Sequence, residues 1–481
     1  MTVLWGTPLA PGEPGAGARS GGVRSGAVRS RWLPRAELLP LLATVVLLAA
    51  PLPAGSEAGS GRLAPSDLAS AVLVVWCLVQ VARGRTRPLG PAAALVLGLP
   101  VVAVAVAAVT AADPVAALPG VVRYLQVFVL VPGAVLLLLR GARDFRAVAA
   151  ALALVALVQG AIGLHQYATG TGASYMGADI RAVGTFGPTD VMGMATVVAY
   201  GLLVALALAL RPPPGAPRWV RPAAVAVAAG LLVPLALSFS RGAWIATALA
   251  ALVMIALTGA RQALKAVAVV TAAGVVLVGG FGVGSELISQ RVSSITRVAQ
   301  APDRSVTDRY TMWAAAASMW REQPLTGVGL KGFPAHRDGH ATIGLSSAGD
   351  TGGAGQAFRR QPLLSPHNMY LLILSEQGLI GVTAFAGSWA LILAAGVRRL
   401  LRGAGRRGAE CGLAAVALML WQTVDFLYAD IGGPSTVLTG VVLGLAAWWG
   451  LAGAPRAPGA PRAPRAPGAP GAAGRERATA P

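Results

Sequence analysis

The sequence predicts an all-α polytopic membrane protein with about 12 transmembrane helices, and three observations carry this prediction. The chain of 481 residues is 55% hydrophobic and only 12% charged, which is a membrane composition and not that of soluble domains. Apolar runs of about 20 residues, the length that crosses a bilayer, recur along the chain. Arginine gathers in every second break between these runs, as the positive-inside rule expects.

The apolar runs divide the chain into five parts. A tail over 1–36, rich in Gly, Pro, Ser and Arg, is expected to be disordered and cytoplasmic. Helices 1–9 are expected within 37–284, a large extracytoplasmic loop over 285–365, and helices 10–12 within 366–453. The tail 454–481 repeats Ala-Pro-Arg and Ala-Pro-Gly and is also predicted to be disordered and cytoplasmic. The predicted spans lie near 37–54, 66–82, 91–112, 118–139, 146–168, 188–210, 222–239, 241–258, 264–284, 366–395, 409–429 and 432–452.

The net charge of +20 is best explained by membrane topology. A soluble protein with this charge would suggest nucleic acid as a partner, but here the cations follow alternate spans. They occur as Arg83, Arg85 and Arg87, as Arg140, Arg143 and Arg146, as Arg211, Arg218 and Arg221, as Arg261 and Lys265, and as Arg398, Arg399, Arg402, Arg406 and Arg407. This alternation predicts a multi-pass protein of the inner or plasma membrane, with both termini in the cytoplasm and no nucleic-acid partner.

Several chemistries have no sequence support. The two cysteines, Cys77 and Cys411, lie inside apolar runs and form neither a disulfide framework nor a zinc spacing. The sequence contains no phosphate-binding loop of the ATPase type, and its external segments carry no Asp cluster suited to a catalytic divalent metal. We therefore expect no cofactor and no metal site.

The stretch from Ser365 to Tyr370 joins the longest polar segment to an apolar run. Pro366 suits a first helical turn and Ser365 can cap it, so a membrane helix is predicted to begin here. His367 then lies at the mouth of the helix, where an imidazole can serve as a general base. Glu376 lies within the apolar run, where a carboxylate marks either a binding site or an ion pair between helices.

Some arginines are not explained by topology. Arg181 and Arg241 fall on the predicted external side, where the rule expects few cations, and Arg309 begins a helix predicted over 307–322 in the external loop. The planar guanidinium fork matches phosphate oxygens, so these three arginines could hold a diphosphate. Salt bridges or lipid headgroup contacts are the alternative. Arg123, inside span 4, needs a partner or must reach the interface.

Other polar and aromatic residues add to this set. His336 is a second candidate base in the loop. Gln159 and Gln166 share a face of span 5 and are expected to line a polar cleft or to bond between helices. The helix over 307–322 has one aromatic face, which fits either a position at the lipid headgroups or packing onto the membrane domain; its residues are Tyr310, Trp313, Ala317 and Trp320.

Taken together, the spans, the loop before span 10 and four short motifs resemble the O-antigen ligase and O-antigen polymerase superfamily of membrane glycosyltransferases. The resemblance covers about 150–395. The motifs are Arg181 followed by Gly184–Asp190, then Ser240-Arg241-Gly242, then Asp308-Arg309 with Trp313 and Pro324–Gly329, and finally His367-Asn368 with Glu376–Gly381.

The resemblance implies a GT-C-like enzyme that works without a metal. It would transfer a glycan from an undecaprenyl-diphosphate carrier to an acceptor outside the cytoplasm. Carried over to this sequence, His367 would activate the acceptor hydroxyl and Arg241 would take part in catalysis. Substrate binding would involve Arg181, Arg241, Arg309, His336 and Glu376.

The acceptor remains open. A second glycan would make the protein a polymerase, a lipid core a ligase, and a protein hydroxyl an O-oligosaccharyltransferase. Outside this class, a multi-span transporter or flippase of lipid-linked glycans also fits twelve spans. A third alternative is a structural membrane scaffold, in which the histidine and arginine motifs would have no function. The expected partners are the undecaprenyl-diphosphate-linked glycan, a glycan, lipid or protein acceptor, and membrane lipids.

Overall fold

A computed structural model describes nine stretches of the chain: 35–51, 64–86, 88–175, 178–187, 190–259, 304–341, 364–403, 408–433 and 435–452. All of them lie in one compact unit that begins at Arg35. The predicted span 264–284, the tail 454–481 and nearly all of the tail 1–36 lie outside the described residues, as do parts of the predicted loop 285–365.

The described residues are mainly helical, in agreement with the prediction. The α-helices are α1 (Leu39–Val46), α2 (Pro65–Ala82), α3 (Pro91–Val109), α4 (Pro114–Leu125), α5 (Val131–Leu138), α6 (Ala142–Thr169), α7 (Gly193–Leu210), α8 (Val220–Leu237), α9 (Arg241–Thr258), α12 (Arg304–Glu322), α13 (Phe333–His340), α14 (Met369–Leu401), α15 (Ala409–Asp425) and α16 (Thr436–Leu451). The short 3-10 turns η1 (Ala36–Leu38) and η2 (Leu47–Ala49) flank α1, and a π-helical turn, η3 (Gln126–Leu130), joins α4 to α5.

Eight helices in the described part of the chain are long and apolar enough to cross a membrane, and two shorter apolar helices accompany them. One of the eight is the continuous run through α4, η3 and α5. Each predicted span within the described residues coincides with a helix to within a few residues. The chain is therefore an integral membrane protein.

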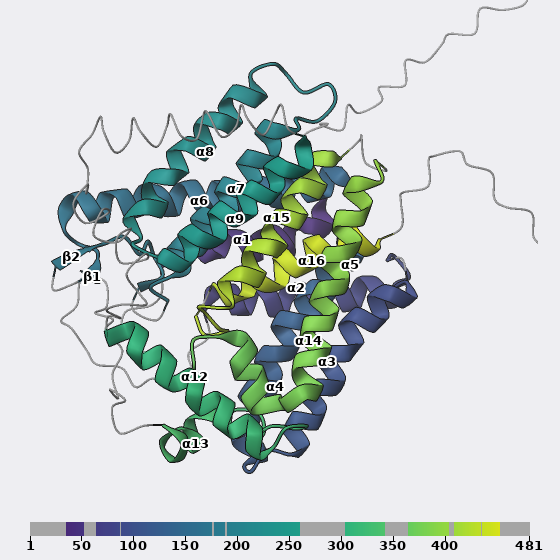
Figure 1. Cartoon of the computed structure of the whole chain (residues 1–481). Helices are drawn as coiled ribbons and strands as arrows, with labels where there is room; N and C mark the ends of the chain where they lie inside the picture. Colours follow the sequence, from purple (N-terminus) through teal and green to yellow (C-terminus); the bar gives the residue numbers. More distant parts are fainter. Residues whose placement is uncertain are drawn as a thin grey trace, which may run out of the picture. The chain divides into compact units, whose positions relative to one another are not determined.

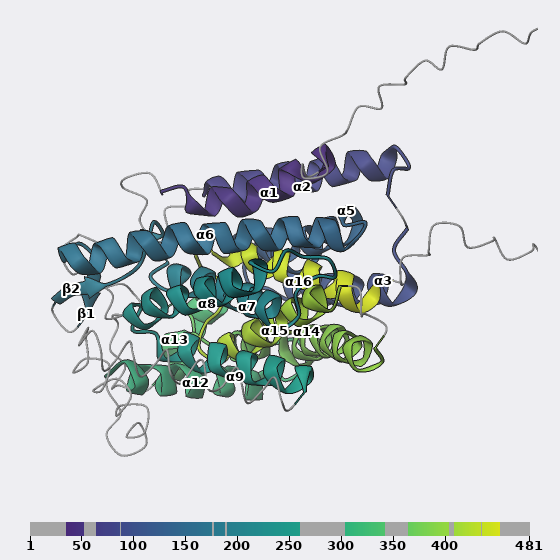
Figure 2. The ribbon, with the colours of Figure 1, turned by 90° about the horizontal axis from the view of Figure 1, so that it is seen from above.

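The helices pack around a common apolar core, some against a chain neighbour, such as α7 on α8, and others against a helix distant in sequence, such as α14 on α3. Figure 2 shows α1 and α2 along one side of the long helix α6, with α7 and α8 on its other side. Helix α14 packs against α3, α15 and α16, and α12 packs on α14. Figure 1 shows α12 and α13 at the lower left, on the same side as the strands β1 (Ala173–Tyr175) and β2 (Ala178–Arg181).

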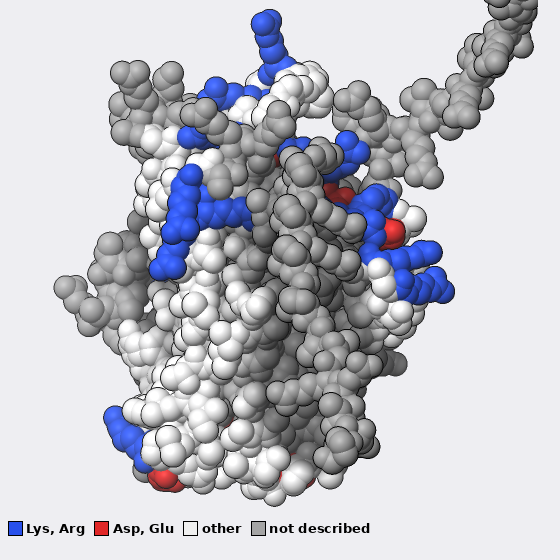
Figure 3. All heavy atoms as spheres, turned by 90° about the vertical axis from the view of Figure 1, so that its right-hand side faces the viewer, with Lys and Arg blue, Asp and Glu red and all other residues white. Residues whose placement is uncertain are grey.

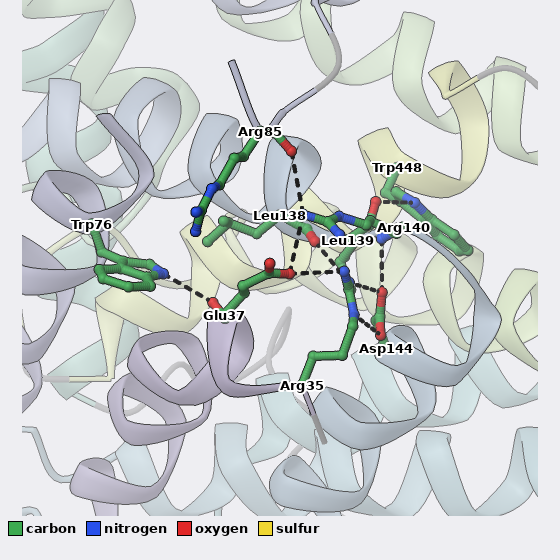
Figure 4. A network of polar contacts seen from close by, with 9 residues as sticks. All are labelled: Arg35, Glu37, Trp76, Arg85, Leu138, Leu139, Arg140, Asp144 and Trp448. Atoms are coloured by element: carbon green, nitrogen blue, oxygen red, sulfur yellow. Dashed lines mark hydrogen bonds and ion pairs between the residues drawn. The ribbon is translucent and has the colours of Figure 1, made fainter. Parts of the chain in front are cut away.

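One end of the bundle is rich in arginine. Figure 3 shows Lys and Arg side chains gathered in its upper part, above a broad uncharged surface. Figure 4 shows how some of them tie helix ends together: Arg35 pairs with Asp144 and with Glu37, and Arg140 pairs with Glu37 at 3.1 Å. At the same end, Arg146 pairs with Glu410 at 2.6 Å. We call this the arginine-rich end.

The first and last residues of the described bundle, Arg35 and Ala452, both lie at the arginine-rich end. The Arg35 guanidinium donates to the Leu138 carbonyl at 3.2 Å, and the Trp448 indole donates to the neighbouring Leu139 carbonyl at 3.1 Å (Figure 4). The Arg399 guanidinium reaches the Ala452 carbonyl at 3.0 Å. Arg35 and Ala452 therefore lie at the same end, as an even number of crossings between them requires.

Strands β1 and β2 are a feature that the all-α prediction did not include. They form an antiparallel hairpin in which Ala173 pairs with Arg181 and Tyr175 with Ala178. Gly172 lies so close to β2 that a Cβ atom there would be 2.3 Å from the Arg181 carbonyl oxygen. The hairpin gives Arg181 a fixed backbone position, which a plain loop would not.

Helix α12 packs onto the membrane domain, which was one of the two interpretations left open for it. Met312, Ala315, Ala316 and Met319 are buried in the common core. The Trp313 indole donates to the Pro366 carbonyl at 2.9 Å. The helix already includes Arg304, so Thr307, the predicted N-cap residue, lies inside it.

Candidate active site

The start of α14 is fixed on the turn that follows α15. Asn368 caps α14, because its Oδ1 accepts from the Leu371 N–H at 3.0 Å, while its Nδ2 donates to the Leu427 carbonyl at 3.2 Å. The Met369 N–H also points at this turn, 2.9 Å from the Phe426 carbonyl oxygen. Two segments about 60 residues apart in sequence are thereby held together.

The predicted cap of α14 is wrong. The helix begins at Met369, three residues after Pro366, and the capping side chain is that of Asn368. Ser365, the predicted cap, instead donates its hydroxyl to the Asp430 carboxylate. Among the described residues, the Ser365 oxygen accepts only from the His367 N–H, at 3.4 Å, and His367 has a left-handed backbone with φ of 47°, so the helix cannot run through it and begins after it.

His367 lies next to the same carboxylate. Its Nδ1 is 3.9 Å from Asp430 Oδ2; the imidazole is 45% exposed, whereas the Asp430 side chain is only 11% exposed. His367 adopts a left-handed backbone conformation, with φ of 47°, which turns the chain just before the helix. With a proton on Nδ1 facing Asp430, Nε2 of the half-exposed ring is an acceptor for an incoming hydroxyl.

Arg181 is anchored at the corner between α8 and α9. Its Nε donates to the Ser238 carbonyl at 2.9 Å, and one terminal nitrogen lies 2.9 Å from Met192 Sδ. The next residue, Ala182, donates its N–H to the Leu237 carbonyl at 3.2 Å. Arg181 is thus placed beside the corner that carries Arg241.

The corner itself turns sharply. Phe239 has a φ of 51°, and Ser240 caps α9 by accepting from the Ala243 N–H at 3.2 Å. Arg241 is consequently the first residue of α9. The structure brings together Arg181 and Arg241, which are 60 residues apart in the sequence and were both singled out there.

Two glutamines of α6 hold the loop that follows Arg181. Gln166 Oε1 accepts from the N–H groups of Val183 and Gly184 at 3.0 and 2.9 Å. Gln159 bonds with Thr185 through both ends of its amide, at 2.6 and 3.0 Å. The predicted polar face of this span therefore exists, and within the described residues its contacts go mainly to this loop.

The connection from Phe426 to Ser435, between α15 and α16, joins these pieces. A Cβ atom at Gly242 would be 3.3 Å from the Tyr428 side chain, so the start of α9 lies against this connection. Arg309 of α12 interacts electrostatically with Asp425, at the end of α15. His367 and Arg241 thus belong to elements that contact this connection, which we call the α15–α16 connection, and Arg309 interacts with the residue that precedes it.

The far side of the α15–α16 connection is anchored by buried polar groups. Arg123 donates to the Gly433 carbonyl at 2.9 Å and pairs with Asp67 at 2.5 Å, so Asp67 is the partner that its position in span 4 demanded. Asp190, in the loop before α7, accepts from the Ser435 N–H at 2.8 Å. Burial raises the pKa of the Asp190 carboxyl, and the hydrogen bonds from Ser435 partly oppose this rise.

Glu376 and His336 contact a different part of the chain, the segment between α12 and the start of α13. The Glu376 carboxylate is buried and accepts from the Phe333 N–H at 3.3 Å, next to Lys331. His336 Nδ1 lies 2.9 Å from the Gly332 carbonyl oxygen, one turn earlier in the chain. Among the described residues, the hydrogen bonds of these two side chains go to the segment 331–333 and not to the α15–α16 connection.

A break in α14 receives the beginning of the same segment after α12. Gly378 has φ of 62° and ψ of −158° inside the helix, and Leu379 and Ile380 donate their N–H groups to the carbonyls of Pro324 and Leu325. A Cβ atom at Gly378 would be 2.3 Å from the Leu325 backbone. Glycine is therefore required where the segment after α12 inserts into the break.

Sequence reasoning did not assign a function to Asp430, Asp425 or Tyr428. A signal was present, because Asp425 and Asp430 are the only carboxylates near the end of the apolar run 409–429. A carboxylate at such a place is costly without a partner. The partners, on α12 and before α14, are more than 60 residues away in the sequence and could be identified only from the fold.

The fold and the site together define a helical integral membrane protein with a cluster of cations, carboxylates and an imidazole at one end of its bundle. Residues 223–386 match the family model described as O-antigen ligase. The predicted resemblance to the superfamily of O-antigen ligases and polymerases is thereby confirmed over these residues. No curated protein sequence matches the chain.

The matched region contains most of the predicted site. Arg241, Arg309, His336, His367 and Glu376 fall within it. Arg181, Asp425 and Asp430 lie outside it and reach the site through the contacts described above. The match supports a general class of membrane enzyme of the ligase and polymerase type.

Proposed function

We propose that the protein transfers a glycan from undecaprenyl diphosphate to an acceptor hydroxyl outside the cytoplasm, without a metal ion. In this proposal His367 takes the proton of the acceptor hydroxyl, and Asp430 orients the imidazole and stabilises its charged form. The arginines Arg181, Arg241 and Arg309 bind the diphosphate. The observation that carries the proposal is the contact of His367 with Asp430 at the same connection against which α9 packs at Arg241.

The chemistry is consistent with these residue types. When the bond between the sugar and the diphosphate breaks, negative charge builds up on the leaving phosphate. Fixed guanidinium groups stabilise this charge in the transition state, because they are already oriented before the reaction. Attack by a hydroxyl from the opposite face of the sugar would invert the anomeric centre. The proton leaves the hydroxyl for His367, and the electron pair of the broken bond leaves with the diphosphate.

Glu376 and His336 take a supporting part in this proposal. Both were expected among the substrate-binding residues, and their hydrogen bonds fix the segment that enters the break of α14. We propose that they keep α12, and with it Arg309, in place against α14. They would then affect transfer through the position of Arg309.

The proposed topology follows from the arginine-rich end. We infer that this end faces the cytoplasm, so both termini are cytoplasmic and the site faces outward. With the predicted ninth span the chain would have twelve crossings and a large outer loop before α14, as in a GT-C-like enzyme. The acceptor is a glycan or a lipid core in this proposal, and a protein hydroxyl is the alternative within the same chemistry.

Reconstitution tests the proposal. The full chain in liposomes, supplied with undecaprenyl-diphosphate-linked glycan and with each acceptor class in turn, should form a new glycosidic bond. Transfer should continue in excess EDTA. Glycan that crosses the bilayer without a new bond would instead identify a carrier.

The site assignment has its own test in the same assay. Arg241→Ala and His367→Ala should leave the protein inserted but stop transfer, and the lipid-linked glycan should accumulate. We expect the rate of transfer to fall on the order of 100-fold or more for each variant, which is the usual contribution of a general base or of a fixed cation. Undiminished transfer by both variants would refute this site.

A further inference from the structure

Helix α12 exposes one aromatic ring beside the site. The Tyr310 side chain is 50% exposed, whereas neighbouring residues on the inner face of α12 are buried. Its ring meets that of Trp313 edge to face, with centroids 5.6 Å apart and planes at 74°. The Trp313 indole in turn donates to the Pro366 carbonyl at 2.9 Å. Tyr310 is therefore attached, through one ring contact and one hydrogen bond, to the residue before His367.

The other side chains of this part of α12 already have partners. Met312 and Ala316 pack into the core, and Arg309 interacts with Asp425. Arg309 and Trp313 are four residues apart and so lie on the same face, which is the face toward the α15–α16 connection and Pro366. Tyr310 lies at the border of this face. The ring is held in place by Trp313 but is not packed into the core, so one part of it is free to contact a ligand without further ordering.

We propose that Tyr310 is a stacking platform for a pyranose ring of the glycan at the point of transfer. The inference rests on the proposed function and adds a sugar-binding residue to it. One face of a pyranose presents several C–H groups with a slight positive charge, and the face of an aromatic ring is slightly negative. A tyrosine loses little side-chain entropy on binding, since it has only two rotatable side-chain torsions.

The position of Tyr310 favours a sugar over a lipid chain. In the proposed reaction the first sugar is bonded directly to the diphosphate, so it must lie between the arginines and His367. Tyr310 follows Arg309 directly and is connected through Trp313 to Pro366. The sugar can come from the lipid-linked donor or from a glycan acceptor, and the two sources share the same ring chemistry.

Equilibrium binding separates these cases without requiring turnover. The full-length protein in nanodiscs is titrated with undecaprenyl diphosphate, with undecaprenyl diphosphate carrying one N-acetylglucosamine, and with the free N-acetylglucosamine disaccharide. Tyr310→Ala and Tyr310→Phe are compared with the unchanged protein. Trp219→Ala is the matched control, because Trp219 is an aromatic side chain just before α8 that is 67% exposed.

The expected result is a loss of affinity that is confined to the ligands that carry a sugar. Tyr310→Ala should weaken binding of the sugar-bearing carrier about three- to tenfold and leave the bare carrier unchanged, while Tyr310→Phe and Trp219→Ala behave like the unchanged protein. The same loss for the free disaccharide alone would support the platform and assign it to the acceptor. Equal weakening for both carriers would overturn it in favour of lipid contact. Failure of the unchanged protein to bind either carrier would refute the proposed function itself, and the platform with it.

Discussion

At the scale of single residues, the pair His367 and Asp430 has the geometry of a base with an orienting carboxylate. The separation of 3.9 Å is longer than a hydrogen bond, and Ser365 shares the same carboxylate oxygen. Hydrogen bonds at active sites often tighten only when substrate is bound. In the proposed reaction the carboxylate would act on a ring that it does not yet hold by a hydrogen bond.

Replacement of Asp430 tests this arrangement. In Asp430→Asn the shape is preserved and the negative charge is lost, so His367 loses the group that stabilises its protonated form. We expect kcat to fall on the order of tenfold to 100-fold, with little change in the KM for the donor. Steady-state kinetics of reconstituted transfer provide both parameters. Asp338→Asn, at an exposed site on α13, is the control and should leave both unchanged. A change in KM alone would assign Asp430 to substrate binding.

At the scale of elements, the break in α14 sets the position of the segment after α12. The main-chain N–H groups freed at Gly378 are taken up by the carbonyls of Pro324 and Leu325, and Val328 donates to the Ser375 carbonyl at 2.8 Å. Unpaired backbone groups are costly in a membrane, so this exchange of partners locks two elements together. The lock positions α12, which carries both Arg309 and Tyr310.

Gly378→Ala should disrupt this lock. The new methyl group meets the Leu325 backbone, and the backbone conformation at 378 is one that only glycine adopts easily. We expect a destabilisation of about 1–3 kcal/mol, seen as a lower midpoint of thermal unfolding in detergent. Gly387→Ala is the matched control in the same helix, since no atom lies within 4 Å of its added Cβ; it should be neutral or slightly stabilising. Equal midpoints for the two variants would contradict this account of the break.

A second element, the loop 183–185 after Arg181, depends on the two glutamines of α6. Gln166 accepts two backbone N–H bonds from it and donates one bond at 2.9 Å to the Gly184 carbonyl. Gln166→Ala should leave these groups unpaired, at a cost of about 1–3 kcal/mol. Because this loop follows Arg181, we also expect weaker binding of undecaprenyl diphosphate, measured by titration. Normal stability together with normal carrier binding would show that the loop does not need this support.

At the scale of the whole molecule, charge separates the two ends of the bundle. The arginine-rich end (Figure 3) ties helix termini together by ion pairs, whereas His367 and Asp430 belong to the candidate site. This asymmetry is the basis of the proposed orientation, because arginine-rich segments are retained in the cytoplasm.

Cysteine labelling in intact cells tests the orientation. Ala335→Cys, on α13, should react with a membrane-impermeant maleimide applied from outside. Arg402→Cys, at the arginine-rich end of α14, should react only after the membrane is opened. The native Cys77 and Cys411 are buried and give a low background. The reverse pattern would place the proposed site in the cytoplasm and refute the proposed function.

The sequence by itself determined the class of fold and named most residues of the candidate site. Apolar runs of membrane length and alternating arginines predicted helices that the structure confirms, because a bilayer leaves the backbone few alternatives. Cations that topology did not explain pointed to Arg181 and Arg241, and short motifs pointed to the O-antigen ligase family, which the comparison confirms. These are local or periodic signals that can be read along the chain.

Only the tertiary structure decided which groups meet. The partnership of His367 with Asp430, of Arg309 with Asp425 and of Arg181 with the α8–α9 corner depends on the packing of helices far apart in sequence. The predicted cap of α14 was wrong because His367 has a left-handed backbone, which delays the helix to Met369, while the Ser365 hydroxyl bonds to a carboxylate 65 residues away. Local propensity can identify a side chain able to cap a helix, but only the fold decides at which residue the helix begins.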